Sequence, residues 1–392
     1  MAATTVEPQW IDTDDEFASL VELLETKPIY GFDTEFHRER SYYPHLALIQ
    51  LSWDEGVAVV DPLAVDITPI KRVLEGPGLA IVHAAEQDLE VLDHVCSTIP
   101  ARMFDTQIAA AFCGLGFASL AKLVGALVGD RLPKGDRLTD WTRRPLDKGQ
   151  IAYAASDVVY LLGMTEQLKE KAHKAGTLDW IEEECERVRT RPLGPPDPDA
   201  AWWKIKGSRS FRGSTRGVAQ EVAGWRERLA AKRDIPPRFV LAELALSSIV
   251  QRGPRSREDL SRIRGLDGRA LKGGAEQEIL AAVERGEALN KDQLRLPTKG
   301  EPPLEDLGPT IALGQALIAR ISEDRGIEPS MLGSRFDVHS LAAGRTSGKL
   351  ASGWRHEIAG RPLLDLLAGR LGITGNGKGG VRLIPLDDDS SS

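Results

Sequence analysis

The chain has 392 residues, of which 42% are hydrophobic, and a formal net charge of −8 at pH 7. This is the composition of a soluble globular protein, and the length is enough for two or three domains. No apolar run approaches the ~18 residues of a membrane span, and Met1–Glu16 lacks the basic and apolar pattern of a secretion signal. Three scattered cysteines without a CxxC pair predict a cytoplasmic protein without a zinc site or a membrane partner.

Short apolar strands alternate with helical patterns as far as residue 190. The patterns predict strands at 29–36, 46–52, 56–60, 79–82 and 102–104. They predict helices at 68–75, 86–94, 106–113, 117–126, 147–169 and 178–189. We expect Asp105 to cap the helix at 106–113. The alternation of strands and helices predicts an α/β domain over residues 8–190.

Helical patterns without strands follow two Pro-rich stretches. The first stretch lies in the linker 191–207 and precedes helices expected at 218–233, 239–251, 256–263 and 275–285, within a domain at 211–290. The second, Leu296–Pro303, precedes helices expected at 309–325, 334–342 and 361–371. Residues 320–330 echo residues 228–238, which predicts a diverged second copy of the helical domain at 304–372. Residues 373–392 are expected to form a mobile tail.

Charge is unevenly distributed along the chain. Residues 1–199 carry 19 basic and 34 acidic side chains, residues 200–290 carry 18 and 11, and residues 291–392 are balanced. An acidic front with a basic module behind it is typical of an enzyme that grips a polyanion away from its chemistry. Chance variation of surface charge is the alternative.

Two carboxylates one residue apart, Asp33 and Glu35, lie in the predicted strand 29–36. Side chains alternate along a strand, so both point to the same face. Two neighbouring buried carboxylates repel each other and lose hydration, and a divalent cation such as Mg²⁺ or Mn²⁺ would offset that cost. On spacing alone, a strand end with two solvated acids is an equal alternative.

Two further segments carry acids in suggestive places. Asp88 falls in the first turn of the helix expected at 86–94, where the helix dipole alone would favour it. Tyr153 and Asp157 are four residues apart in a helical segment and therefore share a face. Taken one at a time, each of these features is compatible with ordinary helix surface.

Taken together, the order Asp-x-Glu, Asp, Tyr-x-x-x-Asp resembles the active site of the DEDD superfamily of 3′–5′ exonucleases, in its tyrosine subtype. The flanking sequences Asp33–Leu51, Phe104–Ala109 and Asp136–Leu146 resemble the ribonuclease D family. The segments 226–240 and 257–266 resemble the small helical HRDC domain that this family shares with RecQ-type helicases. The resemblance implies a ribonuclease H-like exonuclease domain, with a mixed sheet flanked by helices, followed by one or two small all-α domains that bind nucleic acid.

The resemblance also implies a set of roles. Asp33, Glu35, Asp88 and Asp157 would hold two divalent cations, Mg²⁺ or Mn²⁺, that stabilise the attacking and leaving oxygens of a phosphodiester. Tyr153 would aim the attacking water, since a phenol with a pKa near ~10 is a poor base at neutral pH. Residues expected to contact the substrate are Thr34, Phe36, Gln50, His83, Arg137, Trp141 and Arg143, with Arg144 as a further basic neighbour of Trp141. For Trp141 a place in the core is an equal alternative, and for His83 a core position is favoured over metal binding.

We therefore expect a metal-dependent 3′–5′ exoribonuclease that trims the 3′ ends of tRNA precursors and other stable RNAs and releases nucleoside monophosphates; its partners would be tRNA precursors and structured RNA with a single-stranded 3′ end. A 3′–5′ DNA exonuclease is the alternative within the same class, because the catalytic residues do not distinguish the two sugars. A non-catalytic RNA-binding scaffold is the alternative from another class. The complete set of five motif residues argues against the scaffold.

Overall fold

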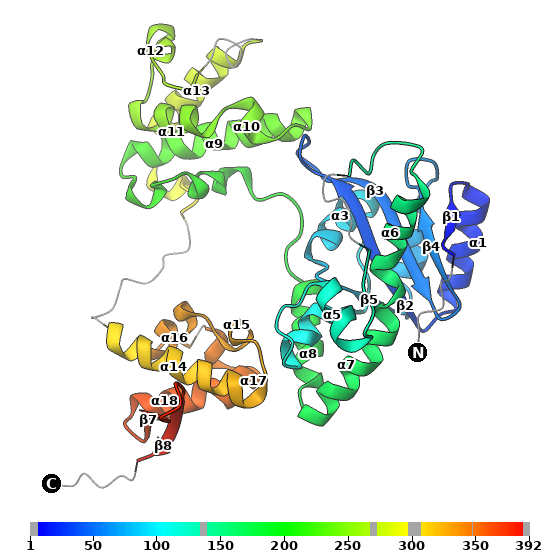
Figure 1. Ribbon diagram of the computed structural model, residues 1–392. Helices are drawn as coiled ribbons and strands as arrows, with labels where there is room; N and C mark the ends of the chain where they lie inside the picture. Colours follow the sequence, from blue (N-terminus) through cyan, green and yellow to red (C-terminus); the bar gives the residue numbers. More distant parts are fainter. Residues whose placement is uncertain (1–6, 134–138, 267–272, 297–306, 347, 387–392) are drawn as a thin grey trace, which may run out of the picture.

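The computed structural model describes residues 7–133, 139–266, 273–296, 307–346 and 348–386. Figure 1 shows an N-terminal unit built on a sheet (residues 9–189), a helical middle unit (198–293) and a C-terminal unit (308–385). The sheet of the N-terminal unit has the strand order β1-β4-β3-β2-β5-β6. Strands β2, β3 and β4 run antiparallel, and the other neighbours pair in parallel. The strands are β1 (Gln9–Ile11), β2 (Ile29–His37), β3 (His45–Trp53), β4 (Gly56–Val60), β5 (Leu79–Val82) and β6 (Met103–Asp105).

Helices cover both faces of this sheet, and the mixed α/β architecture expected from the sequence is confirmed. They are α1 (Asp14–Glu25), α2 (Ile70–Leu74), α3 (Glu86–Cys96), α4 (Thr106–Phe112), α5 (Leu120–Leu127), α6 (Lys148–Val159), α7 (Leu161–Ala175) and α8 (Leu178–Arg189).

Three differences from the expected elements stand out. The helix expected at 147–169 is divided at Tyr160 into α6 and α7. Strand β1 and helix α1 were not predicted. For α1 the sequence does carry a signal, because Thr13 accepts a hydrogen bond from the backbone N–H of Glu16, as N-cap residues do. Strand β1 has three residues, too few to show a period.

Helix α6 lies across β2, β3 and β4, and a glycine permits its close approach. A Cβ atom at Gly31 would lie 2.2 Å from Ser52 Oγ and 3.3 Å from the carbonyl oxygen of Val158 on α6. Ser52 Oγ donates a hydrogen bond to that carbonyl at 2.9 Å. The missing side chain at position 31 therefore brings α6 down onto the middle of β2.

The middle unit has its own hydrophobic core. Helices α9 and α13 cross closely, because a Cβ atom at Gly217 would lie 2.0 Å from the carbonyl oxygen of Gly286. Trp202, in a preceding 3₁₀ turn, is buried in the same core. The elements are 3₁₀ turns Pro198–Lys204, Ser208–Ser210 and Lys291–Gln293, and helices α9 (Ser214–Arg233), α10 (Pro237–Val240), α11 (Glu243–Arg252), α12 (Arg257–Ser261) and α13 (Ala275–Ala288).

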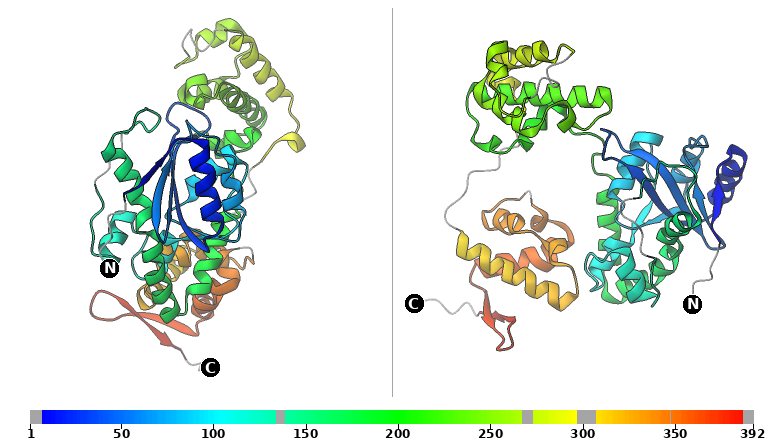
Figure 2. Two further views of the ribbon diagram at one scale, coloured as in Figure 1. Left: turned by 90° about the vertical axis from the view of Figure 1, so that its right-hand side faces the viewer. Right: turned by 45° about the horizontal axis from the view of Figure 1, so that its top comes forward.

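The middle unit meets the N-terminal unit at the loop between β2 and β3 (Figure 2), and Asp234 accepts several of the hydrogen bonds there. Asp234, in left-handed conformation at the end of α9, accepts hydrogen bonds at 3.0 Å from the backbone N–H groups of Tyr42 and Tyr43. Its other oxygen lies 2.6 Å from His45 Nε2. Arg238 also donates to the carbonyl oxygen of Glu39. The loop between β2 and β3 is therefore the docking point for the middle unit.

The C-terminal unit shares one hydrophobic core with the N-terminal unit. Trp354 stacks on Trp180 of α8 with ring centroids 5.0 Å apart and lies edge-on to Phe112 of α4 at 5.3 Å. The elements of this unit are α14 (Gly308–Arg325), α15 (Pro329–Leu332), α16 (Arg335–Ala342), a 3₁₀ turn Lys349–Ala351, α17 (Gly353–Arg355), a π-helical turn His356–Gly360, α18 (Arg361–Leu367), β7 (Leu371–Gly375) and β8 (Val381–Pro385).

The tail expected from residue 373 contains regular structure among the residues that the structure describes. Strands β7 and β8 pair as an antiparallel hairpin. Asn376 stabilises the turn, because its side-chain oxygen accepts hydrogen bonds from the backbone N–H groups of Lys378 and Gly380. Residues 387–392 lie outside the described residues. None of the helices in the described ranges is both long and apolar enough to cross a membrane.

Candidate active site

Two acids on β2, Asp33 and Glu35, form the centre of the candidate site. In the pairing with β3 they face Gln50 and Leu48, and both point to the face that α6 covers. Asp157 belongs to α6 and is half-buried. The close approach of α6 to β2 therefore brings a third carboxylate to the pair that the sequence places one residue apart.

All four acids of the expected set have raised pKa values, and those of Asp33 and Glu35 are raised in part by the charges of the other acids. Burial, followed by the charges of Asp88, Asp157 and Glu35, raises the pKa of Asp33 well above its usual value. Burial and the charges of Asp157 and Asp88 raise the pKa of Glu35 to about 8. Burial also raises the pKa of Asp157 to about 7 and that of Asp88 to about 6. The structure thus gathers four carboxyl groups from three separate elements into one electrostatic cluster.

Asp88 reaches this cluster because β5 is shorter than β2. The last β2–β5 pair joins Gly31 to Ile81, so the backbone N–H of Thr34 lies beyond the paired region. Asp88 Oδ1 accepts that N–H at 3.1 Å and also accepts a hydrogen bond from the Thr34 hydroxyl. These two bonds lower the pKa of Asp88 and partly offset the effect of its burial. Thr34, expected to contact substrate, therefore holds one of the acids.

A second buried carboxylate supports the turn that carries Asp88. The expected N-cap role of Asp105 is confirmed, since it accepts the backbone N–H groups of Gln107 and Ile108. Asp105 also accepts the N–H groups of Ala84 and Ala85, at 3.0 and 3.1 Å, in the turn between β5 and α3. Ala84 has a left-handed φ of 59°, a strained conformation for alanine. Sequence reasoning missed this second role, because no local pattern links residues twenty apart.

Tyr153 lies one helical turn before Asp157 on α6. Its ring stacks on Trp141, with centroids 6.1 Å apart and planes inclined by 19°. Trp141 is 9% exposed and belongs to the hydrophobic core. Of the two alternatives for Trp141, the structure supports the core position, from which it orients the Tyr153 ring.

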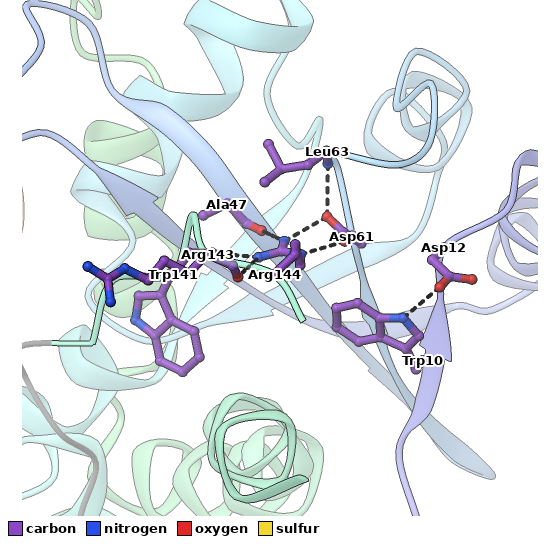
Figure 3. A network of polar contacts seen from close by, with 8 residues as sticks. All are labelled: Trp10, Asp12, Ala47, Asp61, Leu63, Trp141, Arg143 and Arg144. Atoms are coloured by element: carbon purple, nitrogen blue, oxygen red, sulfur yellow. Dashed lines mark hydrogen bonds and ion pairs between the residues drawn. The ribbon is translucent and has the colours of Figure 1, made fainter. Parts of the chain in front are cut away.

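The basic residues around Trp141 divide into different roles, as Figure 3 shows. Arg144 points inward and binds both oxygens of Asp61, at 2.5 and 2.6 Å, together with the carbonyl oxygens of Ala47 and Trp141. The expectation that Arg144 contacts substrate was wrong, because these partners occupy its guanidinium group. Arg143 is exposed, and its Nε lies 3.3 Å from Oδ2 of Asp140. Arg137 lies outside the described residues.

The remaining expected substrate contacts lie in different places. Thr34 and Phe36 line a cavity of about 400 Å³ beside Asp33 and Asp88. His83 is half-buried, its Nδ1 lies 3.0 Å from Thr106 Oγ1, and burial lowers its pKa. Gln50 is fully buried opposite Asp33. Neither His83 nor Gln50 is among the residues that line the cavity.

The residues of the cluster suit a hard divalent cation. All four candidate ligands are carboxylates, the donors that Mg²⁺ and Mn²⁺ prefer. The amide of Gln50, buried beside Asp33, has no hydrogen-bond partner among the described residues, as expected for a group that faces water or an ion. Within the described ranges, however, no three His, Cys, Asp or Glu side chains are drawn together as closely as the ligands of one ion. The carboxylates would therefore have to turn inward to hold a cation.

Comparisons with known proteins place this arrangement in context. Residues 8–173 match the family model described as 3′-5′ exonuclease, and residues 215–283 match the HRDC domain. Ribonuclease D of Escherichia coli is 36% identical over 372 residues, which cover 92% of this chain and 98% of that protein. Ribonuclease D of Gluconacetobacter diazotrophicus is 34% identical over 376 residues, covering 94% of this chain and 95% of that protein.

The fold of this chain is also similar to solved structures, including that of one of these relatives. The crystal structure of Escherichia coli RNase D, described as an exoribonuclease involved in structured RNA processing, superposes with a TM-score of 0.82. The two sequences are 34% identical in that comparison, which covers 92% of this chain and 99% of the other. A protein from Bifidobacterium adolescentis, 21% identical, shares the fold with a TM-score of 0.69 over 93% of this chain.

Proposed function

The chain belongs to the ribonuclease D family and is a 3′–5′ exoribonuclease, and on this premise we propose which residues act and on which RNA. Family membership implies divalent metal ions and an RNA substrate. Our proposal is that the enzyme trims tRNA precursors and other structured RNAs from single-stranded 3′ ends and releases nucleoside monophosphates. It acts in the cytoplasm with two cations, Mg²⁺ or Mn²⁺. The observation that carries the proposal is the gathering of four carboxyl groups with raised pKa values from β2, α3 and α6.

Asp33, Glu35, Asp88 and Asp157 would hold the cations in this proposal. The cations supply positive charge for the oxygens on which negative charge develops during hydrolysis. Without that charge Asp33 and Glu35 retain protons near neutral pH and Asp157 does so in part, whereas Asp88, with a pKa of about 6, is mostly ionised. The protein therefore provides a strongly anionic pocket whose ionisation and cation binding support each other.

Two further residues set the geometry of this pocket. The hydroxyl of Tyr153 orients the attacking water, and its ring is fixed by the stack on Trp141. Thr34 holds Asp88 through two hydrogen bonds, so that this acid keeps its place when the ionisation of its neighbours changes. Gln50 lies under α6 with an amide suited to water or a carboxylate of the site.

In this proposal the RNA is held by residues near the acids and by the basic segment of the middle unit. Phe36 lies in the cavity wall, and Arg143 is exposed beside the Trp141 segment. The basic residues of the 200–290 segment add sequence-independent attraction to phosphates, and such attraction weakens as salt rises. This distribution of charge supports a long RNA that reaches from the middle unit to the acids.

The alternatives named from the sequence are not favoured. The relatives that match over more than nine-tenths of their length are ribonucleases, which does not favour a DNA exonuclease. A scaffold without activity does not account for the gathering of all four acids and Tyr153 around β2 and α6.

The test is degradation of defined substrates by the purified full-length protein. A tRNA precursor with a 3′ extension and a DNA of the same sequence, each labelled at the 5′ end, are incubated with Mg²⁺, Mn²⁺ or chelator. We expect metal-dependent shortening of the RNA from its 3′ end and release of nucleoside monophosphates. Glu35→Gln should abolish shortening, whereas the matched variant Glu22→Gln, on the exposed side of α1, should not. Internal cleavage, or equal activity in chelator, would contradict the proposal.

A further inference from the structure

The cavity beside Asp33 and Asp88 has a wall that comes from the far end of the chain. Most of its lining belongs to the N-terminal unit, including Phe36, Gln107 and Phe117, but Met331 belongs to α15 of the C-terminal unit. Met331 follows Val188, the nearest lining residue of the N-terminal unit along the chain, by 143 residues. The C-terminal unit is thus part of the candidate active site as well as part of the shared core.

Met331 is held firmly in this wall. Its carbonyl oxygen accepts a hydrogen bond at 2.6 Å from Nε of Arg355, which in turn is paired with the buried Glu184 of α8. At the start of α15, the backbone N–H of Glu328 donates to the carbonyl oxygen of Ala111 on α4 at 2.7 Å. Both ends of α15 are therefore attached, directly or through one side chain, to helices of the N-terminal unit.

The lining has the chemistry that recognises a nucleobase. Phe117 is 47% exposed although it is aromatic, so one face of its ring is available for stacking. Met331 adds a polarizable thioether, which makes favourable contacts with aromatic rings. Gln107 also lines the cavity; its amide nitrogen donates to the carbonyl oxygen of Ala118, which leaves the amide oxygen as an acceptor, and Asp33 and Asp88 belong to the same lining. A volume of about 400 Å³ lies within the range of sites for small organic groups.

We propose that this cavity binds one nucleobase of the RNA next to the scissile phosphate, and that Met331 and Phe117 contact that base. The inference rests on the proposed function, since it takes the acids as the place where the phosphate is cleaved. It assigns the C-terminal unit a direct part in substrate binding. Contacts of this kind are tolerant of sequence, because every base has a π-face that can stack.

The experiment compares intact RNA with RNA that lacks single bases. Single-stranded oligoribonucleotides, intact or abasic at one of the three 3′-terminal positions, are degraded by the full-length protein and by Phe117→Ala, Met331→Ala and Met331→Leu. For one abasic position, wild-type kcat/KM should fall about tenfold. Phe117→Ala and Met331→Ala should show a similar loss on intact RNA and no further loss on that abasic RNA. Met331→Leu should retain most activity.

A matched control separates base contact from loosening of the C-terminal unit. Leu332 is fully buried next to Met331 and is absent from the cavity lining, so Leu332→Ala should affect intact and abasic RNA equally. If Met331→Ala and Phe117→Ala also affect both RNAs equally, the base-binding inference is overturned. If the wild-type protein does not shorten RNA with either metal, the proposed function itself fails, and the two failures are thereby distinguishable.

Discussion

Glu184 on α8 accepts a hydrogen bond at 2.5 Å from Arg355 of the C-terminal unit, and both side chains are buried. The second carboxylate oxygen of Glu184 accepts one from Arg187 at 2.8 Å. Arg187 lines the cavity and Arg355 holds the carbonyl oxygen of Met331. One buried acid thus joins two units of the chain and orders two sides of the candidate substrate pocket.

Breaking this pair should destabilise the whole protein. Arg355→Ala leaves the Glu184 charge buried with Arg187 as its remaining partner, and loss of one member of a buried pair costs about 3–5 kcal/mol. The free energy of unfolding from urea titration measures this loss. As the control, Arg361→Ala removes an exposed pair with Glu357 and should cost under about 1 kcal/mol. Equal losses in the two variants would show that the buried pair contributes no more to the free energy of unfolding than the exposed pair does.

Because of the same pair, the stability of the protein should decrease as the pH falls into the acidic range. Burial alone would raise the pKa of Glu184, but the hydrogen bonds from Arg355 and Arg187 outweigh it and lower that pKa below 4.5. A lowered pKa means that the stabilisation is complete above the unfolded value and is lost as pH falls through the folded one. The melting temperature of the wild type should therefore fall more steeply below about pH 4.5 than that of Glu184→Gln. Glu182→Gln, exposed on the same helix, should follow the wild type.

The acids that we propose as metal ligands should give the opposite dependence when metal is removed. The pKa of Asp157 is raised by burial from 3.8 to about 7. In chelator this group stabilises the protein fully below about pH 4, and the contribution is lost as pH rises to about 7, by up to about 1.4 kcal/mol per pH unit. Asp157→Asn should show a shallower loss in urea titrations over that range. An unchanged slope would contradict the burial of a proton-retaining carboxyl group at this position.

Tyr153→Phe should slow turnover and leave metal binding unaltered. Removing the hydroxyl takes away the group that we propose to orient the attacking water, and positioned groups of this kind contribute roughly 10²–10⁴-fold. The stack on Trp141 survives, because phenylalanine keeps the ring. Single-turnover rates on RNA and calorimetric titration with Mn²⁺ measure the two effects separately. A large loss of metal affinity would show that Tyr153 acts as a ligand or supports one.

Asp234→Ala should release the middle unit from the β2–β3 loop. The carboxylate bonds to Tyr42 and Tyr43 and its contact with His45 are lost, while each core keeps its own packing. Small-angle scattering should report a larger radius of gyration, with the unfolding of the N-terminal core unchanged within about 0.5 kcal/mol. Asp292→Ala, exposed in the same unit, is the control. An unchanged radius for Asp234→Ala would indicate that other contacts hold the units together.

Local sequence determined the strand and helix faces that carry the candidate site to a large extent. The strand over Asp33 and Glu35 and the spacing of Tyr153 and Asp157 are short-range patterns, and β4, β5 and α8 occur at the residues expected. Such patterns are readable because side-chain direction on a strand or helix repeats with a fixed period. The N-cap at Asp105 was readable for the same reason, since its partners lie two and three residues away.

Tertiary structure alone decided the contacts between distant segments. Arg144 was expected to meet RNA, but Asp61, 83 residues away, takes its guanidinium group. The charge distribution suggested that the catalytic part ends near residue 199, yet its hydrophobic core continues into residues 311–363. Arg187 and Met331 both line one cavity, and they are linked through Glu184 and Arg355 although they belong to different units of the chain. Pairings of this kind have no period in the sequence, because they depend on which surfaces remain to be buried after each unit has folded.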